Sequence, residues 1–135
     1  MTKALRLFGL AAGVWLIGLG INQMAFSVDV IPGGGRIDPS ADSAIRTGGA
    51  LFIGFGLAYL WAFWRSPIPV VAVRLLAFTA ALVGVARLNS MAVIGLPHRV
   101  VVASVIDFAG AALTFWYSTL AEPPRARDDP AAGDR

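Results

Sequence analysis

The chain has 135 residues, of which 57% are hydrophobic and only 14% are charged, against about 25% charged in a typical soluble domain. A soluble domain of this length has too much surface for its volume to bury so large an apolar fraction, so the composition indicates that lipid solvates much of the chain. The lack of cysteine excludes disulfides and thiolate metal sites, and the net charge of +3, spread over scattered arginines, argues against a nucleic-acid-binding patch.

The first predicted helix covers residues 4–26. Residues 7–28 carry no charge, and about 20 such residues suffice to cross a bilayer. A secretory signal is the alternative, but the apolar part of a signal usually has only about 7–15 residues, which favours a spanning helix. Gly9 and Gly13 form a GxxxG pattern, which allows two helices to approach closely in lipid and also occurs by chance in a glycine-rich chain.

Residues 27–44 are predicted to form a loop, because Pro32 and the three glycines after it cannot continue a helix. Residues 39–42 could instead begin the next helix or form a short turn on the membrane surface. The second helix is predicted over residues 45–64. Small residues recur every four positions along one of its faces, at Ala50, Gly54, Ala58 and Ala62. Such a strip predicts contact with another helix in the membrane.

The third and fourth helices are predicted over residues 69–91 and 99–120, joined by a turn at 95–97. Arg87 lies ten residues before the last residue of this turn, and Asp107 lies ten residues after it. At about 1.5 Å per residue, the two side chains therefore lie at equal depth on antiparallel neighbours. Each charge costs about 2.5–3.5 kcal/mol at the centre of a spanning helix, so we expect Arg87 and Asp107 to form an ion pair.

Basic residues predict the orientation, because they favour the cytoplasmic side. If the N-terminus is cytoplasmic, the inner segments hold seven of the eleven basic residues: Lys3, Arg6, Arg65, Arg74, Arg125, Arg127 and Arg135. We therefore predict an all-α, four-helix transmembrane bundle over residues 1–121 with both termini cytoplasmic, followed by a disordered tail at 122–135. Abundant alanine, glycine and arginine suggest a GC-rich bacterial genome, which places this multi-pass protein in a bacterial plasma (inner) membrane.

Polar side chains gather in the outer half of this predicted bundle, at Asn22, Gln23, Arg46, Arg87 and Asp107. The three charged residues share helical faces with small residues, so we expect them to point into the bundle. The Arg87–Asp107 pair could simply hold the third and fourth helices in register. Alternatively, the polar residues line an outward-facing pocket in which both arginines hold a carboxylate or a lipid phosphate, or one charge contacts a partner subunit. Two arginines to one acid favour an anionic ligand.

No motif in the sequence indicates catalysis. His98 is the single histidine and is expected to be a solvated loop residue, without a metal site. Ser90, Ser104 and Thr114 have no histidine base in their own layer, which argues against a hydrolase triad. The glycines at 33–35 are not followed by Lys and Ser or Thr, so there is no phosphate-binding P-loop. We therefore expect no enzyme, no cofactor and no metal.

Two functional hypotheses follow. The first is a non-enzymatic accessory or assembly subunit of a larger membrane complex, which the small-residue strip on the second helix would contact. The second is a binder or carrier of an anionic lipid or small amphiphile in the pocket of Arg46, Arg87 and Asp107. The expected partners are the lipid bilayer and either other membrane subunits or further copies of this chain; nucleic acid is not expected.

Several short patterns occur together: Arg46-Thr47-Gly48-Gly49, Gly54-Phe55-Gly56, Arg87, Gly95-Leu96-Pro97, and an acid in the fourth helix. With these patterns, residues 5–120 resemble a family of small four-helix bacterial membrane proteins catalogued only as a domain of unknown function. In that family the acid tends to be Glu, whereas here it is Asp107, which has a shorter reach toward Arg87. The resemblance implies the four-helix fold and no particular reaction.

Overall fold

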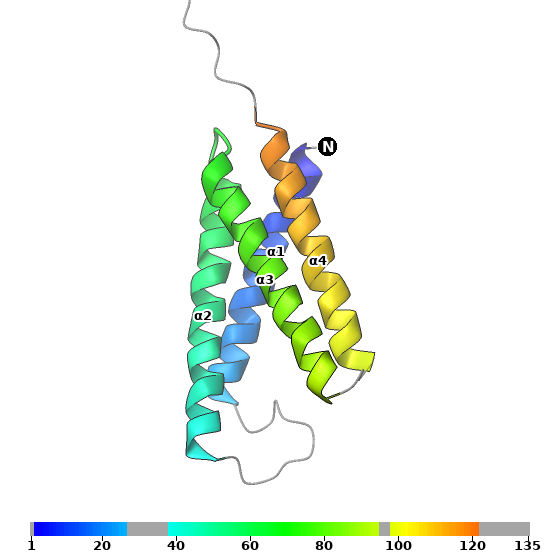
Figure 1. The fold of residues 1–135 in the computed structure, drawn as a ribbon. Helices are drawn as coiled ribbons and strands as arrows, with labels where there is room; N and C mark the ends of the chain where they lie inside the picture. Colours follow the sequence, from blue (N-terminus) through cyan, green and yellow to red (C-terminus); the bar gives the residue numbers. More distant parts are fainter. Residues whose placement is uncertain (1, 27–37, 95–97, 122–135) are drawn as a thin grey trace, which may run out of the picture.

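The computed structural model describes residues 2–26, 38–94 and 98–121. These residues form four α-helices and no strand: α1 (Thr2–Ala25), α2 (Pro39–Trp64), α3 (Val70–Ile94) and α4 (His98–Thr119). Successive helices run in opposite directions, so that the start of α1 and the end of α4 lie at the same end of the bundle (Figure 1). Each helix is long and apolar enough to cross a membrane. The predicted all-α, four-helix transmembrane fold is confirmed.

The α2 helix begins at Pro39, six residues before the predicted start at residue 45. The Asp38 carboxylate caps this end by accepting a hydrogen bond from the Ser40 backbone N–H at 3.1 Å. Proline suits the first helical position, because an N–H there has no partner within the helix. The loop predicted over 27–44 is therefore wrong for residues 39–44, which are helical, and the alternative that residues 39–42 begin the second helix is confirmed.

The other helix ends differ from the predicted ones by at most three residues. The rest of the predicted loop at 27–37, the predicted turn at 95–97 and the predicted tail at 122–135 lie outside the described residues.

Helices α1 and α2 pack closely along most of their length, and glycines make this possible. A Cβ atom on Gly56 would lie 2.6 Å from the carbonyl oxygen of Gly13, and one on Gly49 would lie 2.7 Å from that of Gly20. The two glycines on each helix are seven residues apart, so the antiparallel backbones touch at two levels. In lipid, such close van der Waals contact is a main source of helix association.

The small-residue strip predicted on α2 is not this contact surface. Ala50 and Gly54 are exposed, and a Cβ on Gly54 would meet nothing within 4 Å, whereas Ala62 is fully buried. A four-residue step turns about 40° more than one full circle, so the strip winds around the helix. A seven-residue step drifts by only about 20°, which keeps Gly49 and Gly56 on one face.

Helices α3 and α4 form the second closely packed pair. Gly84 on α3 makes room for the ring of Phe108 on α4, since a Cβ at this position would lie 2.9 Å from ring carbons.

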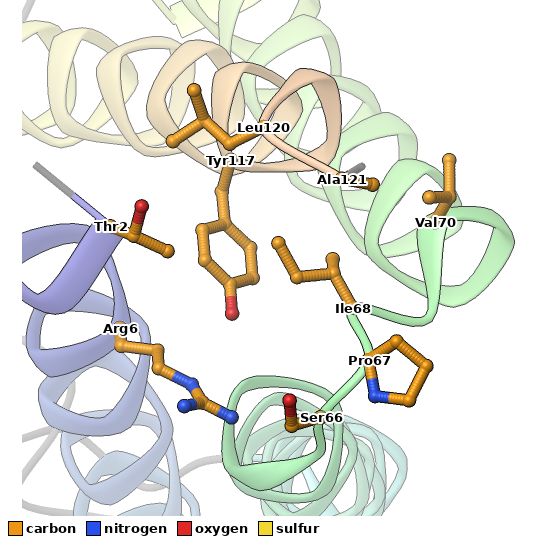
Figure 2. Close-up of a pocket in the computed structure, with 9 residues that line it drawn as sticks. All are labelled: Thr2, Arg6, Ser66, Pro67, Ile68, Val70, Tyr117, Leu120 and Ala121. Carbon is orange, nitrogen blue, oxygen red and sulfur yellow. The ribbon is translucent and has the colours of Figure 1, made fainter. Parts of the chain in front are cut away.

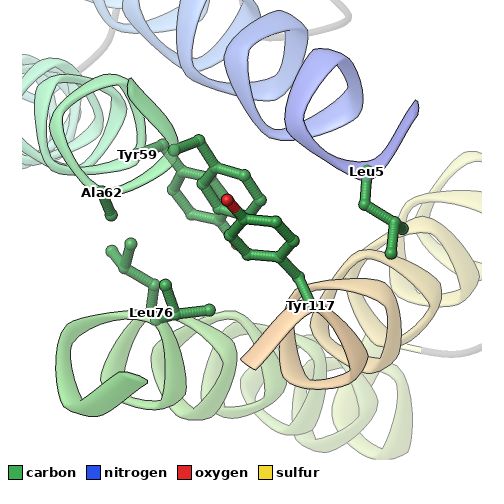
Figure 3. Close-up of a cluster of buried hydrophobic side chains, with 7 residues drawn as sticks. Leu5, Tyr59, Ala62, Leu76 and Tyr117 are labelled. Atoms are coloured by element: carbon green, nitrogen blue, oxygen red, sulfur yellow. The ribbon is translucent and has the colours of Figure 1, made fainter. Parts of the chain in front are cut away.

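The two pairs meet at the end of the bundle where α1 begins and α4 ends. A cluster of buried side chains from all four helices fills this end (Figure 3): Leu5, Tyr59, Ala62, Phe63, Val73, Leu76 and Tyr117. The ring of Phe63 stacks on that of Tyr117, with centroids 4.5 Å apart, and on that of Tyr59, at 5.6 Å. Toward the opposite end the pairs diverge (Figure 1), which leaves a cavity between them.

Candidate functional site

The predicted ion pair joins α3 to α4. Arg87 Nε donates a hydrogen bond to Asp107 Oδ2 at 2.7 Å. Equal depth on neighbouring helices, which the residue count predicted, is thereby confirmed, and the shorter Asp side chain still reaches Arg87. The two side chains are 38% and 22% exposed, so the pair is not sealed inside the α3–α4 contact.

The ion pair opens into a cavity of about 380 Å³ between the two helix pairs, which we call the crevice. All four helices line it. Its polar residues include Gln23 from α1, Arg87 from α3 and Asp107 from α4. Apolar side chains make most of the wall, among them Leu16, Leu19, Phe52, Phe55 and Val83. The crevice therefore combines a mostly apolar wall with one charged, hydrogen-bonding patch, within helices long enough to cross a membrane.

Tyr59 closes the crevice on the side of the buried core. Its hydroxyl lies 3.0 Å from Thr114 Oγ1, a hydrogen bond that joins α2 to α4 across the two helix pairs. Sequence reasoning did not include Tyr59 in the site. Its position in the sequence could have indicated this role, because a tyrosine inside an apolar run usually needs a hydrogen-bond partner on another helix.

Arg46 does not line the crevice, so the prediction that it points into the bundle beside Arg87 is wrong. Its Nε donates to Asp42 Oδ2 at 2.8 Å, and its Nη1 donates to the carbonyl oxygen of Met24 at 2.6 Å. Met24 belongs to the last turn of α1, whose carbonyls have no partner within the helix. The physical reason for the difference is the earlier start of α2, which places Asp42 one helical turn before Arg46.

Asn22 and Gln23 take different positions, although the sequence grouped them. Gln23 lines the crevice, whereas Asn22 is exposed and lies in a shallow hollow on the outer side of α1. Adjacent residues of an α-helix point about 100° apart, so both cannot face the same cavity. Of the five predicted site residues, the structure thus brings together Gln23, Arg87 and Asp107.

The Arg87 guanidinium retains unused hydrogen-bonding capacity. Among the described residues it donates one hydrogen bond, from Nε to Asp107, which leaves the N–H groups of Nη1 and Nη2 for a molecule in the crevice. A guanidinium offers these donors as a planar fork that matches two oxygens of a carboxylate or phosphate. His98, at the start of α4, is exposed, and the described residues hold no group of three His, Cys, Asp or Glu side chains suited to a metal ion.

Comparison with curated proteins and with solved structures gives no significant match. One family model, described as "Domain of unknown function (DUF4345)", matches residues 4–118. The match covers nearly all of the four-helix bundle and both members of the ion pair. The chain therefore belongs to the DUF4345 family, and its predicted membership of a domain-of-unknown-function family is confirmed.

Proposed function

We propose that this protein binds a small amphiphile in the crevice, with the polar head group at Arg87 and Asp107 and the apolar part against Leu16, Leu19 and Phe55. The observation that carries this proposal is an ion pair that opens into an otherwise apolar cavity inside membrane-spanning helices. Ionisable residues at such depth are costly and commonly mark ligand or ion sites. We further propose that the protein is not an enzyme and that it resides in a bacterial plasma membrane with both termini in the cytoplasm.

The charge balance around the crevice narrows the class of head group. The expectation of an anionic ligand assumed two arginines and one acid in the pocket. In the structure, Arg46 pairs with Asp42 away from the crevice, and Arg87 pairs with Asp107, so the crevice holds one arginine and one acid. A head group that both accepts from Arg87 and donates to Asp107 or Gln23 suits this neutral patch best. Protonated carboxylic acids have this combination, and so do zwitterionic head groups whose ammonium carries an N–H.

The proposal is tested by native mass spectrometry of the protein extracted from its own membrane in mild detergent. We expect the unaltered protein to retain a co-purified amphiphile, and Ala80→Phe, which places a ring in the crevice, to lose it. The double variant Arg87→Ala/Asp107→Ala keeps the charge balance and should also lose it. Arg46→Ala is the matched control and should retain it. Equal retention in all four proteins would rule out binding in the crevice.

A second candidate function is that of an accessory subunit which packs against another membrane protein. An apolar groove of about 620 Å³ runs along α2 and α3, lined by residues that include Ala50, Gly54, Ala58 and Val83. This is the small-residue strip that the helices of this chain leave largely uncovered, and small residues let a partner helix approach closely. The proposed occupant is a transmembrane helix of another subunit.

Gly54→Leu tests this second function, because a Cβ at this position meets nothing within 4 Å and the leucine side chain would occupy the groove. Gly18→Leu on α1 is the matched control, since a Cβ there also meets nothing within 4 Å. We expect a partner to co-purify with the unaltered protein and the control but not with Gly54→Leu. A protein that always elutes alone as a monomer would exclude the accessory role.

A further inference from the structure

A second polar pocket lies at the end of the bundle where α1 begins and α4 ends (Figure 2). Its volume is about 660 Å³. Thr2, Arg6, Ser66 and Tyr117 supply polar groups. Ile68, Val70 and Leu120 supply an apolar side. We call it the Arg6–Tyr117 pocket. It is separate from the crevice, because the two cavities share no lining residue.

The environment of Tyr117 is the first observation that indicates a ligand in this pocket. The residue is fully buried, and its hydroxyl has no hydrogen-bond partner among the described residues. Figure 2 shows this hydroxyl directed from α4 toward Arg6 and Ser66. Buried hydroxyls are nearly always hydrogen-bonded, so the Tyr117 hydroxyl indicates a partner that the described residues do not supply.

Arg6 is held in place at the rim of the same pocket. Its Nε donates to the carbonyl oxygen of Phe63 at 3.0 Å, and its Nη2 donates to those of Trp64 at 3.0 Å and Arg65 at 2.6 Å. These carbonyls end α2 and have no partner within the helix. Three bonds thus fix the guanidinium, and among the described residues Nη1 donates no hydrogen bond, so it is available to a ligand.

The charges of the described residues make this end of the bundle positive. Lys3, Arg6, Arg65 and Arg74 lie in the first turns of α1 and α3 or at the end of α2. The acids that the structure describes lie elsewhere, because Asp38 and Asp42 begin α2 at the opposite end and Asp107 faces the crevice. Clustered basic residues beside the ends of spanning helices attract anionic lipid head groups.

We propose that the Arg6–Tyr117 pocket binds the phosphate of an anionic phospholipid from the adjoining leaflet. Arg6 Nη1 and the Tyr117 hydroxyl donate to the phosphate oxygens, and the Ser66 hydroxyl lies beside them. The glycerol and the start of the acyl chains contact Ile68 and Leu120. Helix ends lie at the level of head groups, which is where a phosphate of the bilayer would meet this pocket.

The test uses the full-length protein in mixed micelles with phosphatidylglycerol or phosphatidylcholine, and native mass spectrometry to measure the lipid retained. We expect preferential retention of phosphatidylglycerol, weakened about tenfold by Tyr117→Phe, as for the loss of one hydrogen bond to a charged group. Thermal unfolding without added lipid provides the structural readout. Because Tyr117→Phe removes only an unpaired hydroxyl, the melting temperature should stay the same or rise.

Two control variants separate this pocket from other sites. Tyr59→Phe removes a hydroxyl bonded to Thr114, outside the pocket, and should leave retention of phosphatidylglycerol unchanged. Arg87→Ala/Asp107→Ala alters the crevice and should also leave it unchanged, so this proposal and the crevice proposal can fail independently. Equal retention by Tyr117→Phe and the unaltered protein, or no preference for phosphatidylglycerol, would overturn the proposal. Displacement of the lipid by equimolar inorganic phosphate would show a free-phosphate site instead.

Discussion

Two arginine–aspartate ion pairs of this protein have similar distances but are expected to differ in their contribution to stability. Arg46 and Asp42 are 2.8 Å apart on one helix, with side chains 47% and 32% exposed. An exposed pair of this i,i+4 type contributes little to stability, because water and salt screen it. Arg87 and Asp107 are 2.7 Å apart on two helices, at the depth of the crevice. In a membrane, the loss of one partner there leaves a charge with few polar neighbours, so this second pair matters more for stability.

We predict that Asp107→Ala lowers the free energy of unfolding by about 2 kcal/mol, close to the insertion cost of an unpaired arginine and reduced because the Arg87 side chain is partly exposed. Adding Arg87→Ala to this variant should restore most of the loss, since the remaining charge is removed. Asp42→Ala should cost less than Asp107→Ala, because its partner Arg46 is exposed and the pair is screened. Denaturant titration of the four proteins in mixed micelles measures these values. A double variant less stable than Asp107→Ala would contradict the prediction.

At the scale of the helices, the α1–α2 pair depends on backbone contact at glycines. Gly56 lies against the carbonyl of Gly13, while Gly54, half a turn away, lies against nothing within 4 Å. The two positions have the same residue on the same helix and differ only in the face they occupy. Arg6 adds a second link between α1 and α2, because it bonds the last carbonyls of α2.

We predict opposite effects of the same substitution at these two glycines. Gly56→Ala forces α1 and α2 apart or strains the backbone and should cost about 1–3 kcal/mol, the usual range for overpacking. Gly54→Ala should be neutral or stabilise by up to about 1 kcal/mol, because alanine is the better helix former. Thermal unfolding in detergent, followed by circular dichroism, compares the two. Equal melting temperatures would show that the glycine contact does not hold the pair together.

At the scale of the whole molecule, two tight helix pairs are joined at one end and diverge toward the other. The aromatic rings of Tyr59, Phe63 and Tyr117 hold the closed end. The crevice lies between the diverging pairs, and the Arg6–Tyr117 pocket lies at the closed end, so the two proposed sites are at different levels of the bundle. With 26 residues, α2 is about 39 Å long, which exceeds the hydrocarbon core of about 30 Å.

The proposed orientation predicts which end of α2 faces the cell exterior. The chain has no cysteine, so single substitutions report their own position. In intact cells, a membrane-impermeant thiol reagent should label Ser43→Cys, near the start of α2, and should label Ser66→Cys, after its end, only once the membrane is permeabilised. Both native residues are exposed, so the reagent can reach either site. The reverse labelling pattern would place both termini outside.

The amino-acid sequence alone determined the four spanning helices, the family resemblance and the contact between Arg87 and Asp107. These features depend on quantities that can be read from the sequence of a single helix: the apolar length needed to cross a bilayer, the fixed rise per residue, and the cost of an unpaired charge in lipid. Because only three residues separate α3 from α4, counting residues was enough to place the two charges at one depth.

Only the tertiary structure decided which face each helix presents and what lies against it. It assigned the α1–α2 contact to glycines seven residues apart rather than to the strip of Ala50 and Gly54. It placed Arg46 against Asp42 and the end of α1, and it separated Asn22 from Gln23. These outcomes depend on how two helices cross and on where α2 begins. Both are properties of packed pairs of helices, which the periodicity of a single helix does not contain.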